Sequence, residues 1–152
     1  KIVFAGRLGY GSEEFVATAS ASEFVNDIIF AGYVSDRDLN RLYNEASAFV
    51  FPTVYEGFGF AQVECMSVGL PIILSDIPVN REVARDYGIF FDLNAENTLI
   101  EAMEKVVKEE FDQSRLDELA RSYLPEFNWE RIAEQYVGYM QKLLYPNSIM
   151  GG

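Results

Sequence analysis

Short apolar runs alternate with longer amphipathic segments along most of the chain. The apolar runs contain mainly Ile, Val and Phe, and they cover residues 1–5, 27–31, 48–51, 71–74 and 88–91. Such short and uniformly apolar runs predict buried parallel strands, because a strand with one solvated face would alternate with polar residues. The alternation of strands and helices predicts an α/β fold, a Rossmann-like parallel sheet with helices on both faces.

Capping residues mark the ends of several predicted helices. Residues 36–46 are predicted to be helical, with Ser35 as the N-cap and Asp38 in the place of the usual Glu of a capping box. The next helix is predicted at residues 59–67 and ends before Gly69. Because these helices follow predicted strands, the loops between them lie at the carboxyl ends of the strands, where ligands of α/β sheets bind.

The C-terminal segment is predicted to be helical. Its first helix carries an apolar stripe at Leu99, Ile100, Met103, Val106 and Val107. In the last helix, Asn128 is the predicted N-cap, and Phe127 is expected to pack on Ile132 as a hydrophobic staple. We expect one buried face on that helix, formed by Ile132, Ala133, Tyr136, Val137, Met140 and Leu144.

Composition narrows the function classes. The 152 residues fit one domain, predicted at residues 1–146 with a tail at 147–152. The chain has no histidine and a single cysteine, Cys65, which excludes His-based catalytic triads, an internal disulfide and a multi-cysteine metal site. A net charge of -12 disfavours nucleic acid as a partner. No apolar run approaches the roughly 18 residues of a membrane helix.

Residues 51–64 combine a strand end, two glycines and a helix start. Gly57 and Gly59 allow the backbone to approach a ligand closely, and the first amides of the helix form a ready anion site. Glu64 would lie roughly 6–8 Å along the helix from that end, where its carboxylate can accept hydrogen bonds from a ribose while the amides hold a diphosphate. Glu56 would then face a sugar on the other side of the phosphates. Such turns and glutamates are also common in α/β proteins, so this pattern alone does not decide the function.

Five segments of the sequence resemble one family of enzymes. Glu56 and Glu64 match the E-x7-E motif of the family 4 retaining glycosyltransferases, which have the GT-B fold. Residues 55–59 and 64–71 are similar to the family's EGFG and EAMAxGxP patterns. Its SDIPxxxEV loop, its GxVSDxxLxxLY segment and its FSWE helix start resemble residues 75–83, 32–43 and 127–130.

The resemblance implies that the chain is the C-terminal, donor-binding domain, which binds a nucleotide sugar. It implies that Glu64 binds the ribose hydroxyls. Glu56 would lie against the transferred sugar, as the candidate catalytic residue that positions it rather than as a nucleophile. The sugar and phosphate oxygens would contact the loop amides of Gly57, Phe58, Gly59 and Phe60.

The resemblance also implies contacts with the base of the nucleotide. Tyr33 and Val34 would flank the base, and Leu39 would help to form its wall. Ordinary core packing is an equally good interpretation of Tyr33 and Leu39.

Four further residues have a structural interpretation. Glu82 is expected to brace its loop, and Cys65 to pack as a small apolar residue. Arg81 and Arg85 are expected to be solvated helix charges rather than phosphate ligands.

The sequence departs from the family pattern at its start. The family's domain normally begins with a strand and a Gly-Arg-x-x-x-x-Lys-like loop, whose cations stabilise the diphosphate leaving group. We interpret residues 1–6 as the second strand, because residues 9–14 resemble the loop that follows it, and the first strand with its cations would then be absent. In an alternative alignment, residues 5–8 are the first strand's GRL with Arg7 as the phosphate arginine, but no lysine follows at the required place.

An absent first strand would leave its two neighbours with unpaired backbone groups, because it lies between the second and the fourth strands. A strand from another chain could fill the place, the sheet could re-pair, or the protein could begin before Lys1. Self-association through the unpaired strands is one expected consequence.

The predicted function is hexosyl transfer from a nucleoside-diphosphate sugar with retention of configuration, in polysaccharide biosynthesis. No metal and no cofactor are expected, since the nucleotide sugar is a substrate and protein groups stabilise its phosphates. The carbohydrate or lipid-linked acceptor would bind an absent N-terminal domain, so the isolated chain is expected to bind the donor weakly and to be inactive. The resemblance implies a cytoplasmic location at the inner face of the membrane.

Two rival functions are retained. A nucleotide-sugar epimerase of the same architecture would need additional acid–base groups, and the absence of histidine weighs against it. A non-catalytic interaction domain that kept the fold would be favoured by a degraded motif, whereas Glu56 and Glu64 are both present.

Overall fold

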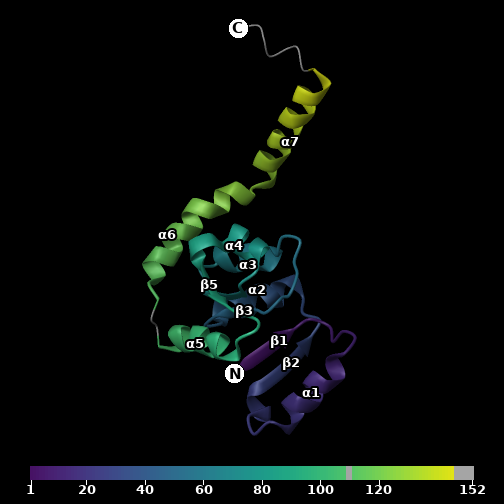
Figure 1. Cartoon of the computed structure of the whole chain (residues 1–152), viewed down its shortest axis with the longest axis vertical. Helices are drawn as coiled ribbons and strands as arrows, with labels where there is room; N and C mark the ends of the chain where they lie inside the picture. The colour runs from purple at the N-terminus through teal and green to yellow at the C-terminus, as the bar shows by residue number, and fades with distance from the viewer. Residues whose placement is uncertain (109–110, 146–152) are drawn as a thin grey trace. The chain divides into compact units, whose positions relative to one another are not determined.

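The computed structural model describes residues 1–108 and 111–145 (Figure 1). The chain divides into two compact units, Lys1–Glu45 and Ala46–Gly152. The predicted domain at residues 1–146 covers the whole of the first unit and most of the second, and the predicted tail at 147–152 lies outside the described residues.

The first unit has two parallel strands with a helix between them in the chain. Its elements are β1 (Ile2–Ala5), α1 (Ser12–Ala21), a short 3-10 turn η1 (Val25–Asp27), β2 (Ile28–Gly32) and α2 (Asp36–Glu45). Ile2 lies opposite Ile28 in the parallel pair. The ring of Phe15 in α1 packs against Phe4 and Phe30, with ring centroids 4.9 and 5.6 Å away, so α1 covers one face of the pair.

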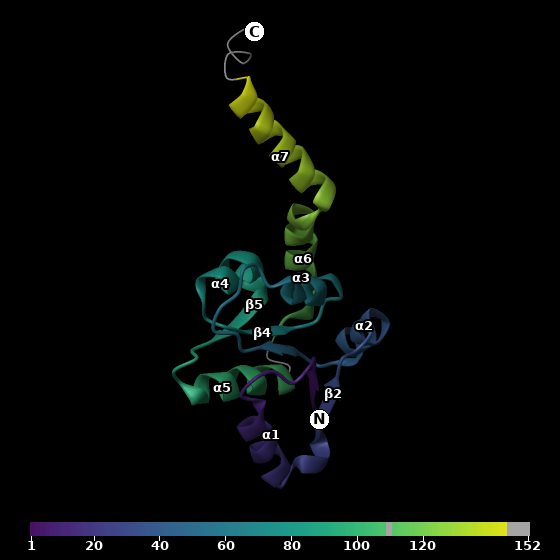
Figure 2. The same ribbon diagram turned by 90° about the vertical axis from the view of Figure 1, so that its right-hand side faces the viewer.

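The second unit contains a three-stranded parallel sheet in the order β3-β4-β5, between two layers of helices. Its strands are β3 (Phe49–Phe51), β4 (Ile72–Ser75) and β5 (Gly88–Phe91). Helices α3 (Phe60–Ser67) and α4 (Pro78–Ala84) lie on one face and α5 (Glu96–Val107) on the other (Figures 1 and 2).

The core of the second unit lies on the central strand. Every residue of β4 is buried, and Ile72 and Leu74 have no exposed surface. On the α5 side, Ile73 packs with Phe91, Ala102 and Val106. A strand buried on both faces needs apolar residues at every position, which explains the uniform run in the sequence.

Three further elements complete the second unit. They are a 3-10 turn η2 (Arg85–Tyr87) after α4, helix α6 (Gln113–Tyr123) with a second 3-10 turn η3 (Leu124–Phe127), and helix α7 (Trp129–Leu144). The carboxylate of Asp112 accepts a hydrogen bond from the amide of Arg115 at the start of α6. At the start of α7, the side-chain oxygen of Asn128 accepts a hydrogen bond of 3.1 Å from the amide of Arg131, which confirms the prediction of Asn128 as the N-cap.

The predicted α/β fold with parallel strands is confirmed, and Ser35 is confirmed as the N-cap of α2, because its Oγ accepts from the amide of Asp38. The carboxylate of Asp38 bonds to the hydroxyl of Ser35, whereas in a capping box it would accept from the backbone amide of the N-cap residue. In the described part of the chain, β1 pairs with β2, and β3 pairs with β4.

The prediction of buried strands is wrong for the first unit. Ile2 and Val3 in β1 are 38% and 40% exposed, and β2 alternates between half-buried and exposed residues. A two-stranded sheet covered by one helix has too few neighbours to bury both faces. The apolar runs therefore predict the two strands correctly, but they do not show whether other elements pack against both faces.

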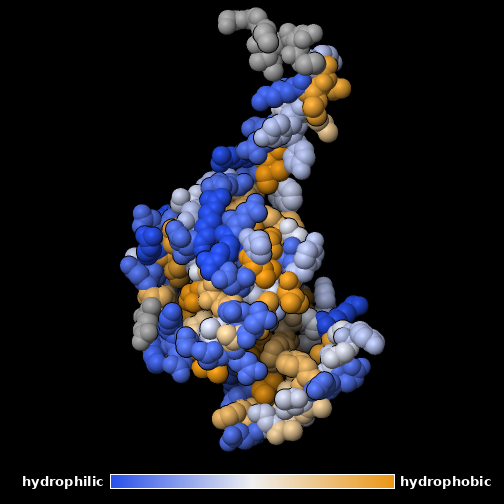
Figure 3. All heavy atoms as spheres, viewed as in Figure 1, coloured by the Kyte–Doolittle hydropathy of each residue, from blue (hydrophilic) through white to orange (hydrophobic). Residues whose placement is uncertain are grey.

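The predicted buried face of the last helix is also wrong. No residue of α7 is buried, and apolar side chains stand on its surface (Figure 3). Tyr136, Val137, Met140 and Leu144 are all more than half exposed. The apolar stripe predicted the helix correctly, but no described element covers the stripe along its length.

Candidate functional site

The loop between β3 and α3 ends in an uncapped helix start. Gly59 is the N-cap of α3 in the left-handed conformation, with φ 79° and ψ 60°, and no side chain caps the helix. The amide of Gln62 donates to the carbonyl of Gly59 at 3.0 Å, whereas the amides before it have no acceptor inside the helix. An uncapped start with the positive end of the helix dipole is suited to an anion.

The surface above the loop is open. A side chain added at Gly57 would meet no atom within 4 Å, so the protein's own packing does not close the space over this backbone. Glu56, one residue earlier, is half-buried. Glu64 lies further along α3 and is exposed. The structure thus places both glutamates and the predicted loop amides on one continuous segment.

An aromatic cluster packs at the end of the loop, where α3 begins. The ring of Phe58 packs on Phe60 and on Phe127, with ring centroids 4.9 and 5.5 Å away. Phe60 in turn stacks on Trp129 at 6.2 Å. The loop is therefore attached to the start of α7, a contact that the sequence did not predict. The predicted packing of Phe127 on Ile132 stays a prediction.

Three polar side chains near the loop have no exposed surface: Gln62, Ser75 and Asn80. None of the three was predicted from the sequence to support the site. A signal was available for Gln62, because helical spacing places it on the same inward face as Cys65 and Met66, where a polar residue is unusual. Cys65 itself is fully buried, which confirms its predicted apolar packing.

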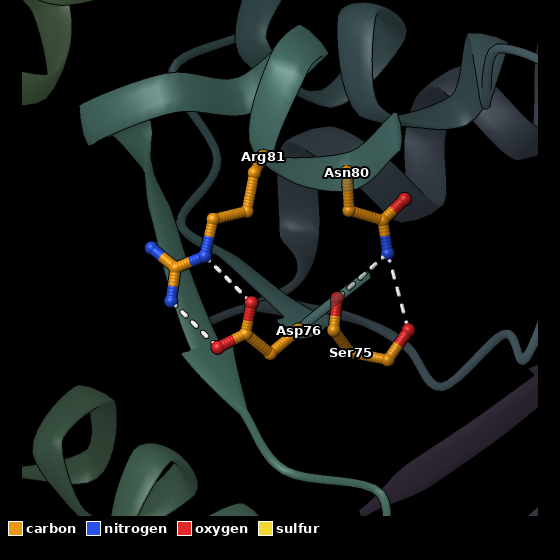
Figure 4. A network of polar contacts seen from close by, with 4 residues as sticks. All are labelled: Ser75, Asp76, Asn80 and Arg81. Carbon is orange, nitrogen blue, oxygen red and sulfur yellow. Dashed lines mark hydrogen bonds and ion pairs between the residues drawn. The ribbon is translucent and has the colours of Figure 1, made fainter. Parts of the chain in front are cut away.

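The arginines of α4 and the turn after it are held by carboxylates. Arg81 makes two hydrogen bonds of 2.6 Å to Asp76, at the end of β4 (Figure 4). These bonds hold the pKa of Asp76 below its usual value. Arg85 forms a similar pair with Glu126, and its hydrogen bonds lower the pKa of that carboxyl. Both arginines already have anionic partners, in keeping with their prediction as helix charges.

The predicted base-binding residues belong to the first unit. Tyr33 and Val34 follow the end of β2, and Leu39 lies in α2. Tyr33 is 74% exposed, with the guanidinium carbon of Arg7 5.9 Å from its ring centre. Val34 and Leu39 are half-buried. The core-packing alternative is therefore wrong for Tyr33, whose ring faces solvent.

The first unit also contains a cavity of about 290 Å³ at the carboxyl end of β1. Phe4, Phe15 and Phe30 line its interior, and Arg7 contributes the one cation of its lining. Glu82, the predicted brace of the loop after β4, is exposed on α4, and its bracing role stays a prediction. Among residues 1–108 and 111–145, no group of three or more His, Cys, Asp or Glu side chains is arranged to hold a metal ion.

Comparison with known proteins identifies the family. A family model described as glycosyl transferases group 1 matches residues 1–123. The chain belongs to this family. Its relatives include O-antigen chain mannosyltransferase B of Escherichia coli, which is 32% identical over 114 residues, covering 72% of this chain and 29% of the relative.

A second relative extends over more of the chain. It is the GDP-mannose:cellobiosyl-diphosphopolyprenol alpha-mannosyltransferase of Xanthomonas oryzae pv. oryzae (strain PXO99A), with 29% identity over 143 residues. The match covers 90% of this chain and 37% of that protein. The chain therefore spans well under half the length of these glycosyltransferases.

Solved structures share the fold. The crystal structure of TarM aligns with a TM-score of 0.70 at 14% identity, over 91% of this chain and 28% of that one. The pneumococcal O-GlcNAc transferase GtfA, solved with UDP and GlcNAc, aligns with a TM-score of 0.62 at 20% identity, over 89% of this chain and 28% of that one. These likenesses confirm the predicted GT-B type of fold. Within residues 1–108 and 111–145, every helix is too short or too polar to span a lipid bilayer.

Proposed function

We propose that this chain is the donor-binding domain of a retaining family 4 glycosyltransferase that transfers a hexose from a nucleoside-diphosphate sugar. The observation that carries the proposal is the uncapped start of α3, open above Gly57, with Glu64 further along the same helix. The helix start supplies donors for a diphosphate, and the carboxylate supplies acceptors for ribose hydroxyls.

Mannose is the hexose that the relatives favour, and GDP-mannose is the first donor to test. The Escherichia coli relative is named a mannosyltransferase, and the Xanthomonas relative is named for GDP-mannose as well. In this proposal, Glu56 positions the sugar. Tyr33, Val34 and Leu39 stay the base-binding residues that the family resemblance implies. Tyr33 has the exposed aromatic surface that such a role requires.

The acceptor and the place of action follow from the same family. We infer a carbohydrate or lipid-linked acceptor, bound by a part of the protein outside this chain, because the chain spans only 29% of its E. coli relative. The proposed setting is polysaccharide biosynthesis in the cytoplasm, at the inner face of the membrane. The proposal needs neither a metal nor a cofactor. Self-association through β1 or β3 stays a prediction, which sedimentation of the purified chain would test.

A thermal-shift panel of nucleoside diphosphates tests the donor assignment. A ligand that binds only the folded state raises the melting temperature, so we expect GDP to raise it more than UDP or ADP. The Glu64→Gln variant should lose the GDP shift, whereas Glu118→Gln, at an exposed glutamate of α6, should keep it. If no diphosphate raises the melting temperature of the folded wild type, the donor assignment is wrong.

An activity assay tests what the chain can do alone. We expect no Glu64-dependent transfer of mannose from GDP-mannose by the isolated chain, because the proposed acceptor-binding part is not included. Transfer that disappears in Glu64→Gln would contradict that expectation. Epimerisation of GDP-mannose would instead favour the rival function, a nucleotide-sugar epimerase. The same assay detects it as conversion of the mannose of GDP-mannose to another sugar in the absence of an acceptor.

A further inference from the structure

Three buried polar side chains form a continuous chain of hydrogen bonds beneath the loop between β3 and α3. Gln62 Nε2 donates to Asn80 Oδ1 at 2.8 Å. Asn80 Nδ2 donates to the carbonyl of Ser75 at 2.9 Å and to its Oγ at 3.1 Å (Figure 4). None of the three residues has exposed surface. These residues therefore connect α3, α4 and the end of β4 through the interior.

The chain of hydrogen bonds reaches both ends of the loop. At its entrance, Ser75 Oγ donates to the carbonyl of Thr53 at 2.5 Å. At its exit, Gln62 Nε2 also approaches the carbonyl of Phe58 at 3.4 Å. The backbone that carries Glu56 and Gly57 lies between these two attachment points, so its ends are held by the same buried network.

Close packing at the exit adds to this attachment. A Cβ on Gly59 would lie 2.2 Å from Gln62 Nε2, so the amide of Gln62 fills the space beside the N-cap of α3. The conformation of Gly59 and the placement of Gln62 therefore depend on each other, since any larger residue at Gly59 would displace the amide.

Stability alone does not explain these polar groups. Gln62 Oε1 and Thr53 Oγ1 are buried and have no hydrogen-bond partner among the described residues. A buried acceptor without a partner is costly, and replacing both members of a buried polar pair by apolar groups of similar shape is often neutral for stability. A network that retains this cost at a loop with open surface above it suggests a role in shaping the loop.

We propose that Gln62 and Asn80 are positioning residues, which hold the loop after β3 in the conformation that receives the donor diphosphate. Both are fully buried, so they act through the backbone of Thr53 and Phe58 rather than by touching the ligand. The inference rests on the proposed function for the identity of the ligand. The holding of the loop is a property of the free protein.

The test replaces the amide pair by apolar groups of similar size, in the double variant Gln62→Met with Asn80→Leu. We expect a melting temperature close to that of the wild type, because both polar partners are removed together. Hydrogen exchange of the amides at residues 54–60 should become about tenfold faster, while β4 and β5 keep their protection. The affinity for GDP, measured by calorimetry, should fall by about tenfold as the loop loses its bound conformation.

A matched control is Asn97→Ala, because Asn97 is an exposed amide that bonds to Glu101 on its own helix. It should change neither the loop exchange nor the affinity for GDP. A folded double variant with wild-type exchange at residues 54–60 would overturn the inference, and so would faster exchange with unchanged affinity for GDP.

If the double variant does not fold, Ser75→Ala provides the second test. It removes the bond to the Thr53 carbonyl and should speed exchange at residues 54–56, while unchanged exchange there would refute the inference. If the proposed function is wrong, the observation is a different one, because the wild type itself would then bind no nucleoside diphosphate. The exchange of the free protein would still decide whether the network holds the loop.

Discussion

The two compact units repeat one local pattern, a strand followed by a loop and a helix that begins at a left-handed glycine. Gly11 precedes α1 with φ 81°, and Gly59 precedes α3 with φ 79°. Neither helix start has a side-chain cap. The surroundings differ, because a Cβ at Gly11 would meet no atom within 4 Å, whereas at Gly59 it would collide with Gln62.

The strands differ in the same sense. β4 in the second unit is buried at every position, and β1 in the first unit is exposed at three of its four positions. A loop becomes firmly held only where the elements around it are packed on both faces and where buried polar groups can reach its backbone. The local sequence pattern alone does not create that support.

The largest difference between the units is expected in their strands. Leu74→Ala in β4 removes a side chain without exposed surface and should lower the free energy of unfolding by about 2–5 kcal/mol. Val3→Ala in β1 alters a side chain that is 40% exposed and should cost about 1 kcal/mol or less. Urea unfolding followed by circular dichroism measures both, and equal effects would remove the contrast between the units.

The two glycines provide the next comparison. Gly11→Ala should cost only the left-handed backbone conformation, about 1–2 kcal/mol. Gly59→Ala adds the collision with Gln62 and should cost more, with a further loss of affinity for GDP because the helix start is displaced. The same unfolding experiment compares the two variants, and a Gly59 variant no less stable than the Gly11 variant would show that the loop is not tightly packed.

Much of this contrast between the two units could not be predicted from the sequence. The strands and the caps at Ser35 and Asn128 were predicted correctly, because a short apolar run and an N-cap residue act over a few neighbouring positions. The exposure of β1 and α7 was not predicted, since burial depends on which elements pack against an apolar surface. Motif spacing placed Glu56 and Glu64 on one loop and helix, as the structure has them.

The supporting residues of the site were also missed, for a related reason. Asn80 meets Gln62 only because α3 and α4 lie side by side, and the two residues are 18 positions apart in the chain. The contact between Phe58 and Phe127 joins segments still further apart. Such long-range contacts leave no periodic signal in a single sequence, whereas a polar residue on an apolar helix face, as at Gln62, does leave one.

The smallest effect is expected at the exposed ion pair between Asp76 and Arg81, beside the buried network. Arg81 lowers the pKa of Asp76, so the carboxylate stabilises the fold above its unfolded pKa, which is near 3.8. That contribution is lost as the pH falls through the lower pKa of the folded state. Asp76→Asn should therefore lower the melting temperature slightly at pH 7, and by less at pH 3. Thermal melts at both pH values measure this. A larger decrease of the melting temperature at pH 3 than at pH 7 would contradict the predicted stabilisation by the ion pair.

The central claim is that the helix start at Gly59 and the carboxylate of Glu64 bind one nucleotide sugar together. An NMR titration of the isotope-labelled chain with GDP tests it most directly, because it reports each backbone amide separately. We predict saturable shifts at the amides of Gly57, Gly59 and Phe60, and an affinity at least about tenfold weaker in Glu64→Gln. Saturable binding that leaves these amides unmoved, or that is indifferent to Glu64, would contradict the account.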